Sequence, residues 1–219
     1  LVTSSDLKEA RPFTANEALR KVSGVSVRDE EGLGLRPNIS MRGIPGDRSR
    51  KLLLLEDGVP ISLAPYGENA AYYFPQIDRI ERIEVRKGSG SILYGPQTIG
   101  GVINFVTPKP PKTRFSEVKT VLGSDSFKSV QYQYGNRFKE NGLLLSVLHK
   151  SGDGPREPMP FNIYDVTSKF ETTLSDSSDL RFKFHYYNED AKASYMGLSQ
   201  QQYDGDPGIN PRSEEHTSE

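Results

Sequence analysis

Residues 83–107 read IEVRKGSGSILYGPQTIGGVINFVT, and this stretch decides how the first half of the chain is interpreted. It opens with a strand-like run, Ile83–Val85, and continues through a glycine-rich turn at Gly88–Gly90. The pair Gly100–Gly101 then leads into a second strand-like run, Val102–Val106. Because β-type segments bounded by glycines are typical of strands joined by tight turns, the stretch predicts a small sheet.

The segments upstream of this stretch complete a small mixed α+β domain. The residues Ser4–Asp6 are N-cap types ahead of a helical segment, and Thr14–Glu17 fits a capping box before a second helix that Gly24 ends. The dipeptide Asp57–Gly58 is a hairpin-type turn. Short strands are expected near residues 25–27, 39–41 and 52–55, and a helical turn is expected at 77–80.

The composition excludes several classes of function. Lysine and arginine number 28 against 29 acidic residues, so the net charge does not favour nucleic acid as a partner. The chain has no cysteine, which excludes a disulfide framework, a thiolate metal site and a cysteine nucleophile. His149 and His185 lack metal-ligand spacing, and no nucleophile–base pattern is present. We therefore expect no catalytic residues, no metal site and no enzyme.

The texture of the sequence changes after Pro108–Pro111, which is typical of a stiff linker. In Leu180–Tyr187, apolar or aromatic residues alternate with Arg181, Lys183 and His185. Such alternation predicts strands with one apolar and one polar face. About five strands are expected, around residues 115–122, 130–134, 143–147, 164–171 and 180–187.

The lengths of the connections indicate how these strands are arranged. Residues 139–141 and 175–178 are short turns at one end of an up-and-down sheet, whereas residues 151–161 and 188–208 are long connections at the other end. Short turns at one end and mostly long loops at the other are typical of outer-membrane barrels. A soluble β-sandwich also gives alternating strands, so this pattern alone leaves both architectures open.

Five short motifs occur in an order that resembles the TonB-dependent outer-membrane receptors. They are Asn16–Leu19 with Gly24-Val25, Met41-Arg42-Gly43, Leu55–Pro60, Ile80–Val85, and Leu93-Tyr94-Gly95 with Gly100–Asn104. The resemblance covers residues 1–108 through these motifs, and the remainder through the strand pattern only. Within the family, Ala64–Gly67 and Tyr94–Gln97 look most like ferric citrate receptors.

The resemblance implies an α+β plug domain over residues 1–108, followed by antiparallel strands of a truncated transmembrane β-barrel over residues 109–211. A full barrel of this size class has about 22 strands, with a plugged lumen. The implied function is import of a ferric chelate, such as ferric citrate or a siderophore, across the bacterial outer membrane. The alternatives are a receptor for a non-iron ligand and a soluble β-rich binding or structural protein with a plug-like module.

The resemblance also implies partners. Energy would come from the TonB complex through an N-terminal segment, which we expect to precede Leu1. We expect a signal peptide upstream of Leu1 as well. Outer-membrane lipid and a small iron chelate are the other expected partners. The transported chelate is a ligand, and no cofactor is expected.

The last eight residues, 212–219, resemble a translated sequencing adapter and are expected to be a non-native tail; an ordinary polar tail is the alternative.

Candidate functional residues follow from the same resemblance. Tyr66, Glu68 and Asn69 lie in an expected outward-facing loop and are candidate ligand-binding residues, or they merely pack that loop. A carboxylate at Glu68 would repel an anionic ferric complex, so either Glu68 turns away or the ligand is different. Arg42 matches a family position that seats the plug by pairing with acidic residues of the barrel wall, or it is a solvated surface arginine. Lys87 is the second candidate seating residue. Lys87 stands where the family more often has arginine, and it lacks the bidentate fork.

A basic cluster and the glycines offer two further hypotheses. Arg48, Arg50 and Lys51 are an anion site or, more commonly, a solvated face. The glycines of residues 88–101 lack the spacing of a phosphate-binding loop, so they are interpreted as turn residues.

Overall fold

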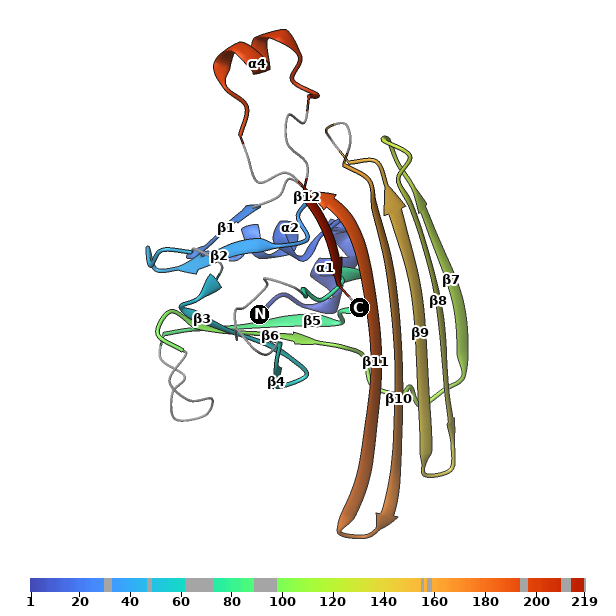
Figure 1. The fold of residues 1–219 in the computed structure, drawn as a ribbon. Helices are drawn as coiled ribbons and strands as arrows, with labels where there is room; N and C mark the ends of the chain where they lie inside the picture. Colours follow the sequence, from blue (N-terminus) through green and yellow to red (C-terminus); the bar gives the residue numbers. More distant parts are fainter. Residues whose placement is uncertain are drawn as a thin grey trace. The chain divides into compact units, whose positions relative to one another are not determined.

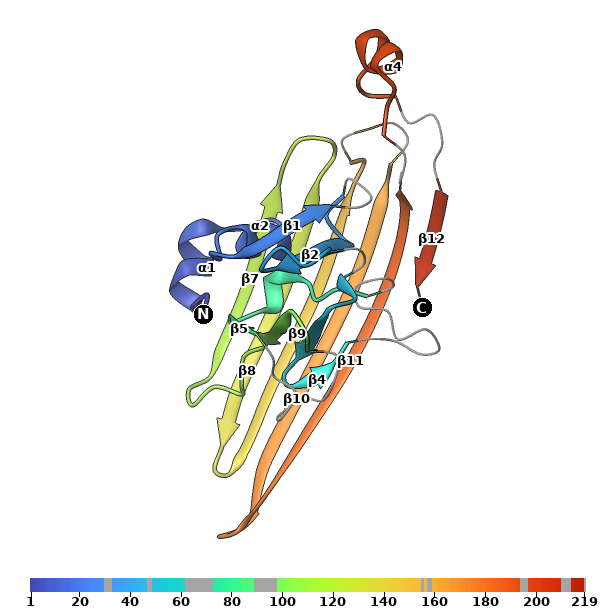
Figure 2. The ribbon, with the colours of Figure 1, turned by 90° about the vertical axis from the view of Figure 1, so that its left-hand side faces the viewer.

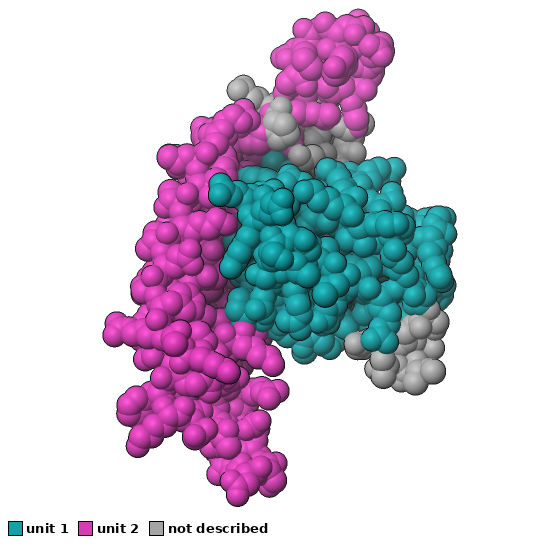
Figure 3. All heavy atoms as spheres, turned by 180° about the vertical axis from the view of Figure 1, so that it is seen from behind, with its two compact units in different colours: residues 1–108 teal, residues 109–219 magenta. Residues whose placement is uncertain are grey.

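The structure is a computed structural model, and it describes residues 1–29, 33–46, 49–61, 73–88, 98–154, 156, 159–193, 197–209 and 214–218. The chain divides into two compact units, residues 1–108 and residues 109–219 (Figure 3). The first unit combines short helices with small sheets, and the second is an open antiparallel sheet. This arrangement confirms the fold class expected from the sequence.

Two short helices open the first unit. Helix α1 (Ser4–Ala10) begins with a true capping box, because Thr3 and Asp6 each accept the other's backbone N–H. Helix α2 (Ala15–Arg20) begins after Thr14, whose side chain makes no capping hydrogen bond. The capping box expected at Thr14 is therefore wrong: the Glu17 carboxylate accepts from the backbone N–H of Phe13 instead.

Two sheets form the rest of this unit. Strands β1 (Val25–Asp29) and β2 (Pro37–Met41) are antiparallel neighbours. The second sheet has the order β4-β3-β6-β5, in which β3 and β6 are parallel and the other pairs are antiparallel. Its elements are β3 (Leu52–Glu56), β4 (Val59–Pro60), β5 (Arg82–Lys87) and β6 (Gly101–Val106), and the short 3-10 helix η2 (Ile77–Arg79) precedes β5.

The N-terminus adds one further contact to this sheet. Val2 and Ile83 exchange two backbone hydrogen bonds, with N···O distances of 2.8 and 2.9 Å. Since β6 occupies one side of β5, Val2 pairs with its other, outer edge. The first residues of the chain are thus attached to an edge strand.

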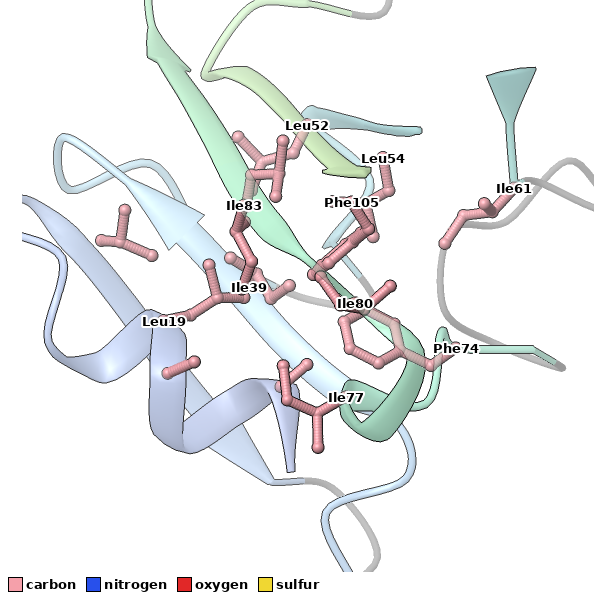
Figure 4. Close-up of a cluster of buried hydrophobic side chains, with 14 of the residues drawn as sticks. Leu19, Ile39, Leu52, Leu54, Ile61, Phe74, Ile77, Ile80, Ile83 and Phe105 are labelled. Carbon is pink, nitrogen blue, oxygen red and sulfur yellow. The ribbon is translucent and has the colours of Figure 1, made fainter. Parts of the chain in front are cut away.

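The core of the first unit lies between the helices and the sheets (Figure 4). All five residues of β3 are buried, as expected of a strand covered on both faces. Leu52 and Leu54 join the main cluster, and Leu53 and Leu55 pack with Val102 in a smaller one. The main cluster also contains Leu19, Ile39, Phe74, Ile77, Ile80, Ile83, Ile103 and Phe105.

Gly101 is the glycine whose replacement the structure forbids most clearly. Its φ angle is +149°, and a Cβ atom added there would lie 2.4 Å from the carbonyl oxygen of Arg86 and 2.8 Å from Sδ of Met41. Because the Arg86 carbonyl oxygen cannot withdraw without moving its strand, β5 and β6 pair at this distance only with glycine at this position.

The second unit is a six-stranded sheet in simple chain order, every pair antiparallel (Figures 1 and 2). Short turns join the long strands at the end opposite helix α4 (Gln200–Gly205). The strands are β7 (Phe115–Leu122), β8 (Lys128–Phe138), β9 (Asn141–Gly152), β10 (Phe161–Ser175), β11 (Ser178–Ala193) and β12 (Glu214–Ser218).

The five expected strands are present, but all except β7 extend further at both ends than expected. Strand β11 continues to Ala193, so the first part of the long connection expected at residues 188–208 is strand. Residues 188–193 read NEDAKA and have low strand propensity, yet they pair with β10 as far as Ala191. Strand β12 lies in the segment expected to be a non-native tail and pairs with β11.

Candidate functional site

The two faces of the long sheet have opposite polarity. One face, which we call the aromatic face, carries exposed apolar and aromatic side chains: Val130, Tyr132, Leu143, Val147, Tyr164, Phe170, Phe182, Phe184 and Tyr186. Alternate residues of the same strands form the polar face, and several are buried: Ser129, Gln131, Ser146, Lys150, Asp165, Thr167 and Glu189. Cross-strand pairs such as Val166↔Tyr186 and Thr167↔His185 keep each face continuous.

This polarity is the reverse of that in a water-soluble sheet. Phe182 and Phe184 are 61% and 51% exposed, whereas Asp165 is 1% exposed. Water-soluble monomers rarely expose an apolar surface that extends over several strands. Strands of outer-membrane barrels alternate in this sense, with an apolar band toward lipid and polar side chains toward the lumen. The aromatic face therefore fits contact with hydrocarbon, which a soluble sandwich would not need.

The polar face carries an ion pair and a histidine–carboxylate contact. Arg137 and Glu171, on β8 and β10, form an ion pair. Nε2 of His185 lies 3.3 Å from Oδ2 of Asp165, on neighbouring strands β11 and β10. Such hydrated or paired groups are suited to lining a polar interior.

The structure brings the two candidate seating residues together at one end of the first unit. The backbone N–H of Arg42 donates to the carbonyl of Gly24, with an N···O distance of 3.4 Å. A Cβ atom at Gly88 would lie 3.2 Å from Nη1 of Arg42, and one at Gly24 would lie 3.5 Å from Nζ of Lys87. Both side chains are exposed. Two neighbouring cations on the surface of the plug could pair with acidic side chains of the barrel wall. This seating role remains a prediction.

The candidate ligand residues Tyr66, Glu68 and Asn69 lie outside the described residues, and so does Arg48 of the basic cluster. Arg50 and Lys51 are described and exposed, as a solvated face requires. The ligand-binding assignments therefore remain predictions.

Side chains of β5 and β6 form a hydrogen-bonded network with the Asp57–Gly58 turn. Oδ1 of Asn104 accepts from the Gly58 N–H at 2.9 Å, and Nδ2 of Asn104 donates to Glu84 at 3.1 Å. Burial alone would raise the pKa of Glu84, but the hydrogen bonds from Asn104 and Arg82 and the charges of Arg82 and Arg86 outweigh it and lower that pKa. This network connects the Asp57–Gly58 turn to Glu84 on β5 and Asn104 on β6, although these residues are far apart in the sequence.

A buried charge cluster is the feature that sequence reasoning missed. Nη1 and Nη2 of Arg79 donate to the two carboxylate oxygens of Glu56, both at 2.7 Å. The Tyr73 hydroxyl donates to the same carboxylate at 2.6 Å and also contacts Arg79. The Arg79 and Glu56 side chains are only 2% and 7% exposed. The available signal was Glu56 itself, a carboxylate that ends an otherwise apolar, buried run.

Across the described residues, no group of three or more histidine, aspartate or glutamate side chains is placed to hold a metal ion. Among the helices of the same residues, none is long and apolar enough to cross a membrane.

Comparison with known proteins adds independent information. The sequence profile described as TonB-dependent Receptor Plug Domain matches residues 1–102. The vitamin B12 transporter BtuB of Vibrio vulnificus (strain CMCP6) is 28% identical over 95% of the chain, and BtuB of Vibrio cholerae serotype O1 (strain M66-2) is 30% identical over 70% of it. The chain spans 31% and 24% of the lengths of these two relatives.

Two solved structures also resemble this chain over most of its length. The unliganded ferric citrate transporter FecA matches with a TM-score of 0.78 and 26% identity, covering 92% of this chain and 32% of that one. FpvA of P. aeruginosa, bound to a heterologous pyoverdine, matches with a TM-score of 0.77 and 17% identity, covering 90% and 26%. The second likeness concerns the fold alone.

Proposed function

Because residues 1–102 of this chain belong to the TonB-dependent receptor plug domain family, we propose that the complete receptor imports a small chelate or vitamin. The chain is part of a bacterial outer-membrane receptor and not of an enzyme. The single observation that best supports the proposal is the reversed polarity of the long sheet, which follows a plug domain in the same chain. An apolar outer face serves insertion in lipid, and a polar inner face serves passage of a hydrated solute.

The proposed cargo is a ferric chelate, with ferric citrate as the first candidate. The sequence motifs Ala64–Gly67 and Tyr94–Gln97 support it, together with 26% identity to the ferric citrate transporter FecA. A corrinoid is the second candidate, because relatives named as vitamin B12 transporters match up to 95% of the chain. Glu68 favours the second candidate if its carboxylate faces the ligand, since an anionic ferric complex would be repelled.

The energy source proposed for import is the TonB complex, acting through a segment N-terminal to Leu1. Val2 is bonded to the edge strand β5, so a pull on that segment would reach the plug sheet directly. In this proposal the plug blocks the lumen at rest and rearranges when pulled.

An uptake experiment tests these proposals. The complete receptor is expressed in a strain lacking its own ferric citrate and corrinoid receptors, and uptake of radiolabelled ferric citrate, a ferric hydroxamate siderophore and cyanocobalamin is measured. We expect uptake of ferric citrate that is lost in a strain without TonB, while surface binding remains. Uptake of cyanocobalamin alone would replace the first candidate by the second. Uptake of none of them, or recovery of the receptor in the soluble fraction, would overturn the proposal.

A further inference from the structure

The buried cluster of Glu56, Arg79 and Tyr73 has no role in ligand capture or plug seating as described above. Arg79 and Glu56 form a bidentate pair with two 2.7 Å hydrogen bonds, and Tyr73 adds a third bond of 2.6 Å to the carboxylate. The pair joins β3, which ends at Glu56, to η2, which ends at Arg79. The pair thus connects an inner strand of the sheet to the short helix that precedes the edge strand β5.

The position of the cluster links two parts of the proposed transport cycle. Arg79 lies four residues before Ile83, whose backbone holds Val2. A pull on the N-terminus therefore reaches Ile83 first and the η2–β5 segment next. At the other side of the cluster, Glu56 precedes the Asp57–Gly58 turn. The cluster thus connects the segment at which the pull arrives to strand β3.

The chemistry of the cluster makes its strength depend on water. A hydrogen-bonded ion pair is strong in a dry interior and weak at a hydrated surface. Once the segment around η2 separates from β3, water solvates both charges and so stabilises the opened state. A pair of apolar side chains of similar volume would hold the closed plug equally well, but opening would expose apolar surface to water.

We propose that Glu56, Arg79 and Tyr73 form a polar latch that keeps the resting plug closed and opens by hydration when the N-terminal segment is pulled. This inference rests on the proposed function only for the origin of the pull. The latch itself consists of the hydrogen bonds among Glu56, Tyr73 and Arg79.

Force measurement on the complete receptor tests the latch without any ligand. The receptor is held in detergent micelles and pulled at constant force from an N-terminal tag, and the rate of plug opening is recorded. The variant Glu56→Leu with Arg79→Met keeps the volume and removes the charges. We expect it to open about tenfold more slowly than the parent, because hydration no longer stabilises the opened state. Tyr73→Phe, which removes the hydroxyl that bonds to both Glu56 and Arg79, should open about threefold faster.

Arg82→Met is the matched control, because it removes only the partly exposed ion pairs of Arg82 with Glu81, directly before β5, and with Glu84 on β5. It should open at the parental rate. Equal rates for the double variant and the parent would overturn the latch. If the double variant fails to assemble, an unchanged rate for Tyr73→Phe overturns it instead.

Uptake separates the latch from the proposed function. With ferric citrate and cyanocobalamin as probes, the double variant should bind as the parent does and transport about tenfold more slowly. Parental binding and parental transport together would contradict the latch. A parent receptor that transports neither probe, with the force results as expected, would refute the proposed function and leave the latch standing.

Discussion

The carboxylate of Asp57 accepts two hydrogen bonds from Thr107, which lies 50 residues further along the chain. The Thr107 N–H donates at 2.8 Å and its hydroxyl donates at 2.6 Å. Thr107 is 3% exposed and immediately precedes the proline-rich linker. The β3–β4 turn is thereby fixed to the point where the plug chain ends and the linker begins.

Replacing this carboxylate should loosen that junction. Asp57→Ala leaves the N–H and hydroxyl of Thr107 without their partner, which we expect to lower the free energy of unfolding of the plug by about 1–3 kcal/mol. Urea unfolding of the complete receptor in detergent, with amide hydrogen exchange at Gly58 and Thr107, measures the change. Glu140→Ala, in an exposed turn of the other unit, is the control and should have no effect. Parental exchange rates at Thr107 in the Asp57 variant would contradict the interpretation.

Gly101 should tolerate no larger residue. Gly101→Ala places a Cβ 2.4 Å from the carbonyl oxygen of Arg86, so the plug should lose roughly 3 kcal/mol or more of stability or fail to assemble. The control is Gly205→Ala in α4, where an added Cβ meets nothing within 4 Å. The amount of each variant assembled in the outer membrane and its urea midpoint give the comparison. A Gly101 variant as stable as the Gly205 variant would show that β5 and β6 can move apart enough to accommodate a Cβ atom.

Glu84 should make plug stability depend on pH. Its pKa is lower in the folded plug than its ordinary value of 4.5, which we take for the unfolded chain. Its stabilising contribution is therefore present above that value and is lost as the pH falls through the folded pKa. The side chain is 43% exposed, so the effect should be small. Glu84→Gln should lower the urea midpoint near neutral pH and have less effect at about pH 3. A constant difference between parent and variant across this range would contradict the assignment.

The aromatic face should not accept charge. Phe184→Lys introduces an ammonium group on this face of β11, which is expected to cost about 2–4 kcal/mol at the bilayer midplane. The yield of folded receptor in the outer membrane should fall accordingly. Lys183→Gln, the adjacent residue on the polar face, removes a charge and should keep the parental yield. Equal yields for both variants would mean that the aromatic face does not meet lipid.

Without detergent, the same face should make the 219-residue chain associate. Phe182 and its neighbours would be exposed to water, and the outer strands of the open sheet have unpaired edges. Sedimentation of the chain in buffer and in detergent micelles checks this expectation. A monomer that unfolds cooperatively in buffer alone would contradict it.

Much of the fold was predictable because local patterns and tertiary structure agree. The run Leu52–Leu55 predicted a buried strand, and β3 is buried on both faces. The alternation of Leu180–Tyr187 predicted the two faces of β11. The extension of β11 to Ala193 was missed, because pairing with β10 rather than local propensity sets that end.

The candidate site was less predictable, since it depends on contacts between distant residues. Proximity of Arg42 and Lys87 follows from the packing of strand ends, which no spacing in the sequence encodes. The bond between Glu56 and Arg79 joins a strand to a 3-10 helix across 23 residues. Its only local sign was an acidic residue after four leucines.

The parallel pairing of β3 with β6 has a consequence for biogenesis. Leu52 is opposite Gly101 in the register, so the segment between them must be complete before the two strands can meet. Contacts of such long sequence separation form slowly, because loop closure precedes the gain from pairing. A nascent chain would therefore carry four consecutive leucines uncovered until Val106 has been synthesised. Uncovered apolar surface of this kind favours aggregation, so we expect the chain to be sensitive to aggregation until that point of its synthesis.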